Sequence, residues 1–306
     1  MKILITGGSG MVGKNVLAIL SNLDHELLFP NSTQLDLTNF KETIKYLKKN
    51  KPDFIIHSAG YVGGIQANMS HPVDFLVNNL DIGRNIVFAS YQVGIKKVLN
   101  LGSSCMYPRN APNPLSEEMI LNGKLEPTNE GYALAKIVTA RLCEYIHREN
   151  SNFQYKTMIP CNIYGYYDNF DPDWSHLIPA IIRKLHQANM MEEKEVEIWG
   201  DGNARREFMY ANDLANAILY SLNNFDEMPF ILNIGIGKDY SIKEYYSIIA
   251  DIIGFKGKFK HNLEKPVGMP QKLVSIEKQT IWGWKPTTKL RDGIQKTYDF
   301  YLHGEK

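Results

Sequence analysis

A tyrosine, a lysine and a serine stand in this sequence at a spacing that suits chemistry on a carbonyl group. Tyr132 and Lys136 are four residues apart in a stretch that reads as a helix, so both side chains project from one face. An ammonium one turn away favours the phenolate and lowers the pKa of the tyrosine, which makes the phenol a usable proton donor or acceptor. Ser103 follows an apolar run, and its hydroxyl could hydrogen-bond a carbonyl oxygen beside Tyr132. We therefore expect Ser103, Tyr132 and Lys136 to act together.

Three glycines near the amino terminus indicate a ligand-binding turn, whose ligand would take part in the chemistry of these three residues. Gly7, Gly10 and Gly13 follow the apolar run 2–6 and precede an amphipathic stretch. Strand, glycine-rich turn and helix in this order are typical of dinucleotide binding, because glycines let backbone N–H groups approach a pyrophosphate at a helix N-terminus. The alternative is a glycine-rich turn without a ligand. The residues expected to bind the cofactor are Gly7, Gly10, Met11, Val12, Gly13, Asp36, Leu37, Ala59, Tyr132 and Lys136.

The end of the expected second strand bears on the choice between NADP(H) and NAD(H). An acidic residue there usually binds the adenosine ribose of NAD, but residues 28–33 offer only short polar groups. This favours NADP(H), although no arginine stands there and NAD(H) stays open. Lys14 is the nearest candidate cation for a 2′-phosphate, or else a solvated surface lysine. Asp36 could flank the adenine or cap the following helix.

Apolar runs alternate with amphipathic stretches through the first half of the chain. This alternation predicts an α/β fold of the Rossmann type, in which a doubly wound parallel sheet is covered by helices on both faces. Strands are expected at 2–6, 26–29, 53–57, 96–101 and 155–160. Helices are expected at 11–23, 39–51, 72–93 and 131–150.

The pattern loosens in the second half. Helices are expected at 176–187, 213–221, 242–253 and 290–302, and isolated strands at 196–199, 230–234 and 256–260. We divide the chain into a dinucleotide-binding domain, 1–161, and a mainly substrate-binding carboxy-terminal cap, 162–306. A segment at about 207–240 is expected to return to the main domain, because 231–235 could add a strand to its sheet.

Composition excludes several other classes of protein. Lys plus Arg is 34 and Asp plus Glu is 33, a net charge of +1, so the 306 residues show no cation excess for nucleic acid. No apolar stretch approaches the ~20 residues of a membrane helix. Three cysteines make neither a disulfide framework nor a zinc site, and no metal is expected. These features predict a cytoplasmic protein that binds neither nucleic acid nor membrane.

Further segments give the sequence a resemblance to a known family. Beside the trio and the glycine turn these are Gly60–Ile65, Leu101–Pro108, Leu125–Asn129, Tyr164–Phe170 and Ser175–Pro179. The chain resembles the extended short-chain dehydrogenase/reductases of the sugar-nucleotide epimerase/dehydratase family, and within it the GDP-L-fucose synthase group of GDP-4-keto-6-deoxy-mannose epimerase/reductases. The resemblance covers essentially the whole chain.

The resemblance implies roles for particular residues. Ser103, Tyr132 and Lys136 would be the catalytic triad of hydride transfer. Cys105 and His176 would be the base and acid that epimerise C3 and C5 beside the 4-keto group, whose protons the ketone acidifies. If the strand before Ser103 persists, Cys105 points the same way as Ser103. A small buried cysteine and a helix-terminal histidine held by backbone are the plainer interpretations.

The resemblance also implies a nucleotide-sugar site in the cap. The residues concerned are Asn162, Arg183, Trp199, Arg206 and Lys272. The cations could neutralise a diphosphate, and the tryptophan could stack on guanine or pack in the cap core. Val267, Met269 and Gln271 stand where the family tends to have Asp, Thr and Arg, which bears on the sugar.

The resulting hypothesis is an NADPH-dependent C4 reductase of a GDP-4-keto-6-deoxy-hexose or GDP-4-keto-heptose, with 3,5-epimerisation as a second activity. Such an oxidoreductase would serve nucleotide-sugar and surface-polysaccharide biosynthesis. The alternatives are an epimerase or dehydratase that keeps NAD bound, and a dinucleotide-sensing protein without catalysis. By resemblance, two long helices, one of them carrying Tyr132, would pair with their twins in a homodimer.

Overall fold

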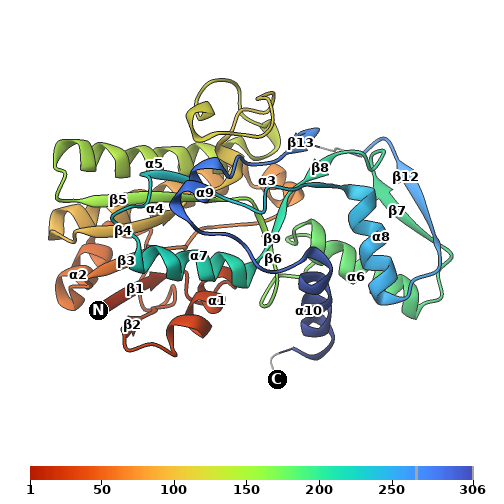
Figure 1. Cartoon of the computed structure of the whole chain (residues 1–306), viewed down its shortest axis with the longest axis horizontal. Helices are drawn as coiled ribbons and strands as arrows, with labels where there is room; N and C mark the ends of the chain where they lie inside the picture. The colour runs from red at the N-terminus through yellow and green to blue at the C-terminus, as the bar shows by residue number, and fades with distance from the viewer. Residues whose placement is uncertain (266–267, 305–306) are drawn as a thin grey trace.

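The computed structural model describes residues 1–265 and 268–304, and a six-stranded parallel sheet lies at the centre of the larger lobe (Figure 1). The strand order is β10-β5-β4-β3-β1-β2, and every neighbouring pair is parallel. The strands are β1 Lys2–Thr6, β2 Glu26–Leu28, β3 Phe54–His57, β4 Lys97–Leu101, β5 Gln154–Pro160 and β10 Ile231–Ile234. After β1, the chain adds β2 on one side and then β3, β4, β5 and β10 on the other. Ligands of doubly wound folds bind where this order of strands reverses, here between β1 and β3.

Helices cover both faces of this sheet, as the expected fold class requires. They are α1 Met11–Leu20, α2 Phe40–Asn50, α4 Pro72–Val93, α5 Glu130–Glu149 and α7 Ala211–Asn223. Ile3 and Ile5 of β1 pack in a core with α1 and α7, while Leu4 between them packs in a core with α2 and α4. The alternation of side chains along a strand therefore explains why a continuous apolar run is needed here. The Rossmann-type prediction is confirmed.

A second lobe, the cap, has a core of its own. Its helices are α6 Leu177–Met190, α8 Ile242–Ile253 and α10 Leu290–His303, and they pack with the parallel strands β7 Glu195–Trp199 and β12 Lys258–Asn262. Ser241 and Glu244 form a capping box that begins α8, and Gly254 with φ +84° ends it. These local signals explain why the expected bounds of this helix, 242–253, agree with the structure.

Ten short elements complete the described part of the chain, and none of them was predicted from the sequence. They are α3 Ile65–Ser70, β6 Asn162–Tyr164, β8 Arg205–Arg206, β9 Phe208–Tyr210, β11 Tyr240–Ser241, β13 Gln271–Lys272, α9 Glu277–Trp282 and the 3₁₀ turns η1 Ser104–Met106, η2 Glu117–Met119 and η3 Pro127–Asn129. Strands of two or three residues show no period-2 pattern that a sequence could reveal. They matter because they carry several side chains of the cavity described below.

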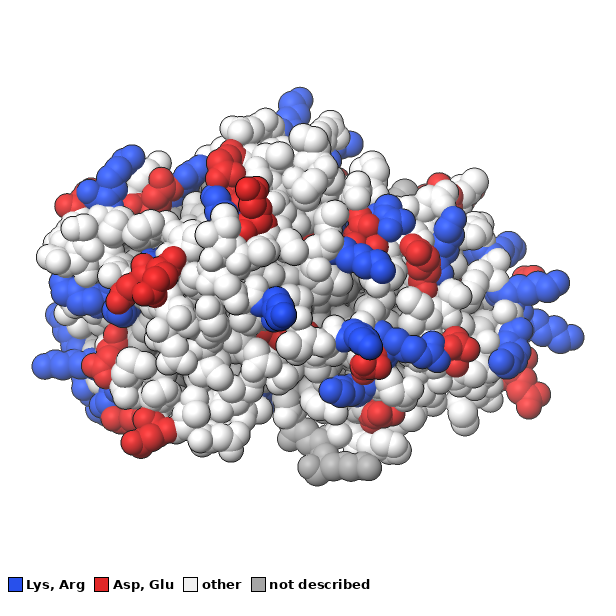
Figure 2. Space-filling model, in the orientation of Figure 1, with Lys and Arg blue, Asp and Glu red and all other residues white. Residues whose placement is uncertain are grey.

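The division of the chain at 161 and 162 stays a prediction. Strand β10 lies within the segment 207–240 and pairs with β5, so the central sheet includes a strand that follows part of the cap in sequence. Figure 2 shows acidic and basic side chains interspersed over the face drawn. In the part of the chain that the structure describes, none of the helices has the length and apolarity to cross a bilayer.

Candidate active site

A cavity of about 950 Å³ runs along the carboxyl edge of the sheet and continues under the cap. It is lined by residues from both lobes, and the residues expected to act in catalysis or to bind the cofactor or the nucleotide-sugar are among them. From the larger lobe these are Gly7, Gly10, Met11, Val12, Gly13, Asp36, Leu37, Ala59, Ser103, Cys105, Tyr132 and Lys136. From the second half of the chain they are Asn162, His176, Arg183, Trp199, Arg206 and Lys272.

The glycine turn has the shape that a pyrophosphate needs. Gly7 has φ +74°, and a Cβ there would lie 2.7 Å from the backbone nitrogen of Ala59. A Cβ on Gly13 would lie 2.2 Å from the carbonyl oxygen of Gly7, so only glycine lets α1 pack this closely. A Cβ on Gly10 would meet only that oxygen, at 3.5 Å, because its other side faces the cavity. The turn and the N-terminus of α1 therefore fit a dinucleotide.

The adenosine end of the cavity corrects one expectation about Asp36. Asn39, not Asp36, caps α2, since its side chain accepts from the backbone nitrogens of Lys41 and Glu42. Asp36 instead accepts from the backbone nitrogen of Thr38 at 2.9 Å and from its hydroxyl at 2.7 Å. The carboxylate therefore already has donors at the side of the cavity where a ribose would lie.

Lys14 was the other candidate at the adenosine end. Its Nζ lies 4.8 Å from the ring centre of Tyr167, in a cation–π contact on the loop after β6. Lys14 is not among the described residues that line the cavity. The geometry thus favours the surface role for this lysine over a contact with a 2′-phosphate.

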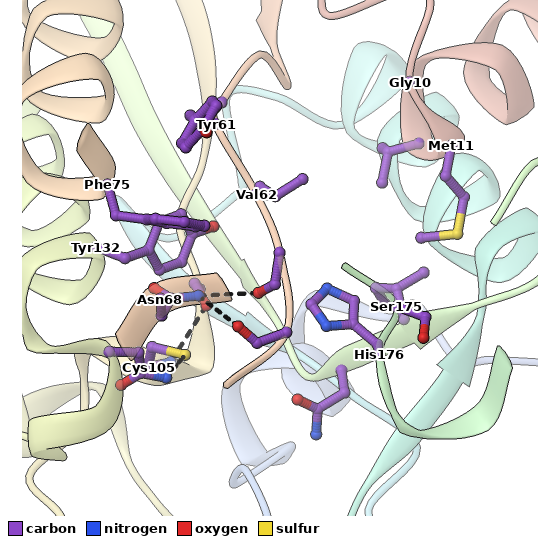
Figure 3. A pocket seen from close by; sticks show the side chains of 18 of the residues that line it. Gly10, Met11, Tyr61, Val62, Asn68, Phe75, Cys105, Tyr132, Ser175 and His176 are labelled. Atoms are coloured by element: carbon purple, nitrogen blue, oxygen red, sulfur yellow. Dashed lines mark hydrogen bonds between the residues drawn. The ribbon is translucent and has the colours of Figure 1, made fainter. Parts of the chain in front are cut away.

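Ser103, Tyr132 and Lys136, the three residues expected to act together, line one cavity. Ser103 follows the end of β4 in extended conformation, and Tyr132 and Lys136 project from the first two turns of α5. The Nζ of Lys136 lies 5.8 Å from the ring centre of Tyr132 and donates to the carbonyl oxygen of Leu101 at 3.0 Å. Tyr132 lines the same cavity as the glycine turn, so its ring does not face away from it (Figure 3).

The charges of this trio differ from the expectation in one respect. Burial, together with the nearby Cys105, raises the pKa of Tyr132, and a hydrogen bond with Ser103 only partly opposes the rise. The prediction that Lys136 lowers this pKa is wrong for the protein alone. Burial also lowers the pKa of Lys136 to about 8. The phenol is therefore protonated at neutral pH and can donate a proton.

Cys105 reaches the cavity by a route other than the expected one. Strand β4 ends at Leu101, and Cys105 lies in the 3₁₀ turn η1, where its backbone nitrogen donates to Oγ of Ser103 at 3.2 Å. The strand does not persist to Cys105, so the condition of the period-2 argument for its direction is not met. The turn nevertheless places Cys105 in the wall of the cavity, and Figure 3 shows it on the same side as Tyr132.

His176 stands on the other side of the cavity in Figure 3, at the residue that precedes α6. Burial, with a smaller contribution from the charge of Lys272, lowers the pKa of its imidazole. The ring is therefore mostly neutral at pH 7, and its protonated form is a stronger acid than ordinary histidine. A thiol and an imidazole thus face one cavity from different elements.

The second half of the chain supplies the remaining lining residues of the cavity. Trp199 ends β7 and is 40% exposed, and the Nζ of Lys265 lies 5.3 Å from its ring centre in a cation–π contact. Arg183 projects from α6 into the same cavity. Asn162 is held by a bond from its Nδ2 to the carbonyl oxygen of Glu207 at 2.8 Å. Of the departures from the family pattern, Met269 lines the cavity, Gln271 binds Asp239 at 2.6 Å, and Val267 lies outside the described residues.

Sequence reasoning assigned no role to Asn129. Its Nδ2 donates to Sγ of Cys105 at 3.0 Å, and its side chain lines the cavity. Asn129 closes the segment Leu125–Asn129 that contributed to the resemblance, so the signal was present but without a function attached. Among the described residues, the structure shows no group of three or more His, Cys, Asp or Glu side chains placed to hold a metal ion.

The fold and the cavity together define a dinucleotide-binding protein with the serine, tyrosine and lysine of a short-chain dehydrogenase/reductase. The chain belongs to the NAD-dependent epimerase/dehydratase family, whose sequence model matches residues 3–235.

Three known proteins resemble the chain along nearly its full length. It is 55% identical to a GDP-L-colitose synthase from Yersinia pseudotuberculosis, over 99% of this chain and 98% of the relative. It is 47% identical to a GDP-L-fucose synthase from Azorhizobium caulinodans, over 100% and 97% of the two chains. A solved structure of a GDP-mannoheptose C4 reductase from Campylobacter jejuni with NADP bound superposes with a TM-score of 0.88, at 32% identity and 98% coverage of both chains.

Proposed function

We propose that this protein is an NADPH-dependent oxidoreductase that reduces the C4 ketone of a GDP-4-keto sugar. One observation carries the proposal: Tyr132 and Ser103 lie in a single cavity between the glycine turn and the cationic side chains of the cap. The activities named for the similar colitose synthase, fucose synthase and heptose reductase support the same substrate class. The test is consumption of NADPH with a GDP-4-keto sugar, and absence of turnover with every such sugar would refute it.

Each member of the trio has a distinct task in this reaction. The nicotinamide cofactor, when bound, supplies the hydride that adds to C4. Ser103 donates a hydrogen bond to the ketone oxygen and so stabilises the negative charge that develops there. Tyr132 then gives its phenolic proton to this oxygen, which completes the alcohol. Lys136 lies one turn away, where its ammonium can stabilise the phenolate left behind and bind the ribose hydroxyls of the cofactor.

The preference for NADP(H) over NAD(H) is the finer part of this proposal. The described residues at the adenosine end of the cavity include Asn31, Ser32 and Thr38, and the carboxylate there, Asp36, is engaged by Thr38. Small polar groups leave room for a 2′-phosphate, which a free carboxylate would repel. We expect kcat/KM with NADPH to exceed that with NADH by at least tenfold, and equal values would remove this part of the proposal.

Epimerisation is a second activity, favoured by Cys105 and His176 sharing the cavity. A thiolate that removes the proton from a carbon beside the ketone leaves an enolate, whose oxygen Ser103 and Tyr132 can stabilise. The imidazolium of His176 can return a proton to the other face of that carbon, which inverts it. Incubation with GDP-4-keto-6-deoxy-mannose in heavy water without NADPH tests this step. Absence of deuterium at both C3 and C5 would leave the reductase activity alone.

The sugar is best determined by direct comparison of candidates. We place GDP-4-keto-3,6-dideoxyhexose first, because the colitose synthase is 55% identical to this chain over 99% of its length. Such a sugar has no hydroxyl at C3, so only C5 would need inversion. A screen of kcat/KM should include this sugar, its 3-hydroxy counterpart and a GDP-4-keto-heptose. A preference for the heptose would move the protein towards the heptose reductases.

A homodimer is the assembly that the surface supports. Helices α4 and α5 pack closely, since Gly131 approaches Leu76 and Gly83 approaches Thr139. The outer face of this pair exposes apolar side chains, which favours association of two such faces. These are Val73, Val77, Leu134, Val138 and Tyr145.

A further inference from the structure

The sulfur of Cys105 has two donors that lie far from it in sequence. Asn129 of η3 donates from Nδ2 at 3.0 Å, and Lys272 of β13 places its Nζ at 3.6 Å. The lysine is 8% exposed, so its ammonium is directed into the protein. This cation was expected to neutralise a diphosphate, whereas in the structure it lies beside the thiol.

The backbone around Lys272 holds the ammonium in this place. Its strand pairs in parallel with β8, and the carbonyl oxygen of Lys272 accepts from the backbone nitrogen of Glu207 at 3.2 Å. On either side, Gln271 binds Asp239 at 2.6 Å and the backbone nitrogen of Leu273 donates to Oδ1 of Asn113 at 2.8 Å. A lysine fixed in this way can act as a positioned charge rather than a mobile one.

The same ammonium acts on both groups of the epimerisation step. It lies in contact with the sulfur of Cys105, and its positive charge contributes to the lowered pKa of the His176 imidazole. A positive charge and an amide N–H both stabilise a thiolate, the form of cysteine that accepts a proton. A positive charge next to an imidazolium has the opposite effect and promotes loss of its proton. Lys272 is thus placed to assist removal of a proton at Cys105 and delivery of one from His176.

We propose that Lys272 and Asn129 are positioning residues that hold Cys105 as the base for proton removal beside the 4-ketone. The inference rests on the epimerase part of the proposed function. The thiolate takes the proton, the C–H electron pair enters the enolate, and the enolate carbon accepts a proton from His176. Solvent then reprotonates the imidazole and deprotonates the thiol, so no oxidant or reductant is needed.

Alkylation of the folded protein by iodoacetamide at pH 7.5 tests the contact without any substrate. Cys143 and Cys161 are 1% and 4% exposed, so peptide mass spectrometry can follow Cys105. Replacing Lys272 by Met keeps most of the length of the side chain and removes its charge. We expect Lys272→Met to slow alkylation by about tenfold or more, and Lys272→Arg to restore part of the rate. An unchanged rate in a variant with unchanged thermal unfolding would overturn the proposal.

Substrate measurements separate this role from diphosphate binding. Lys272→Met should reduce deuterium incorporation from heavy water by about tenfold or more, while KM for the GDP-sugar stays within about twofold. Arg183→Met, a change in a cation from the cap, should instead raise KM and leave alkylation unchanged. A raised KM with unchanged alkylation in Lys272→Met would return this lysine to the diphosphate and refute the inference.

The proposed function and this inference fail in different ways. Wild-type protein that consumes no NADPH with any GDP-4-keto sugar would refute the reductase proposal. Slower alkylation of Lys272→Met would still support the contact with Cys105, because that measurement contains no sugar and no cofactor. Wild-type protein that reduces the sugar but incorporates no deuterium would overturn the role of Lys272 in proton removal.

Discussion

The ammonium of Lys136 lies 5.8 Å from the ring centre of Tyr132, and both side chains line the same cavity as the glycine turn. The two side chains are one helical turn apart, but burial raises the pKa of the phenol and lowers that of the ammonium to about 8. Before cofactor binds, the pair therefore consists of a protonated phenol and a cation that is easily neutralised.

The lowered pKa of Lys136 predicts that kcat/KM for NADPH oxidation depends on pH. Because kcat/KM reports groups of the free enzyme, it should be constant well below pH 8, reach half of this plateau near pH 8 and fall further above it as the amine becomes neutral. Lys136→Arg keeps its charge at high pH, so the fall near pH 8 should disappear even where the absolute rate is lower. A pH–rate profile of NADPH oxidation checks this, and the same fall in Lys136→Arg would assign it to another group.

Removal of the phenolic hydroxyl should affect chemistry and leave folding intact. Tyr132→Phe is expected to lower kcat for C4 reduction by about 10²–10⁴-fold, because the alkoxide loses its proton donor. The thermal midpoint and the Kd for NADPH should change little, since the ring remains. A variant with the activity of wild type would contradict the assignment of Tyr132.

Two glycines of the turn should respond differently to alanine. In Gly13→Ala the added Cβ would lie 2.2 Å from a backbone oxygen, so we expect the free energy of unfolding to fall by about 1–3 kcal/mol. In Gly10→Ala the Cβ projects towards the cavity, so unfolding should change by less than about 1 kcal/mol while NADPH binding weakens. Urea unfolding and fluorescence titration with NADPH measure the two effects. Normal NADPH affinity in Gly10→Ala would show that the pyrophosphate lies elsewhere.

The outer face of α4 and α5 should control the assembly. Leu134→Glu with Val138→Glu places two carboxylates on this face and is expected to convert a dimer into a monomer at micromolar concentration. Leu263→Glu is the matched control, because this leucine is 74% exposed on the cap. Light scattering after size-exclusion chromatography gives the mass. A monomeric wild type would end the dimer proposal.

Sequence could predict the parts of this protein that repeat a pattern over many residues. The helices 72–93 and 242–253 were expected with the bounds that the structure has, because each combines an apolar period with an end signal. The glycine turn was recognisable because strand and helix flank it. In contrast, the contact of Lys272 with Cys105 joins residues 167 positions apart through a two-residue strand, and no local pattern contains it.

Strand β10 belongs to the central sheet but follows part of the cap in sequence, which affects how this chain can be truncated or recombined. Strand β5 completes its pairing only when residues 231–234 are present, so a fragment that stops after residue 161 would present an open β-edge to other chains. Exchange of caps between relatives therefore requires several junctions within the chain. In a chimera with a single junction after residue 161, β10 would come from the protein that supplies the cap, and not from the one that supplies β5.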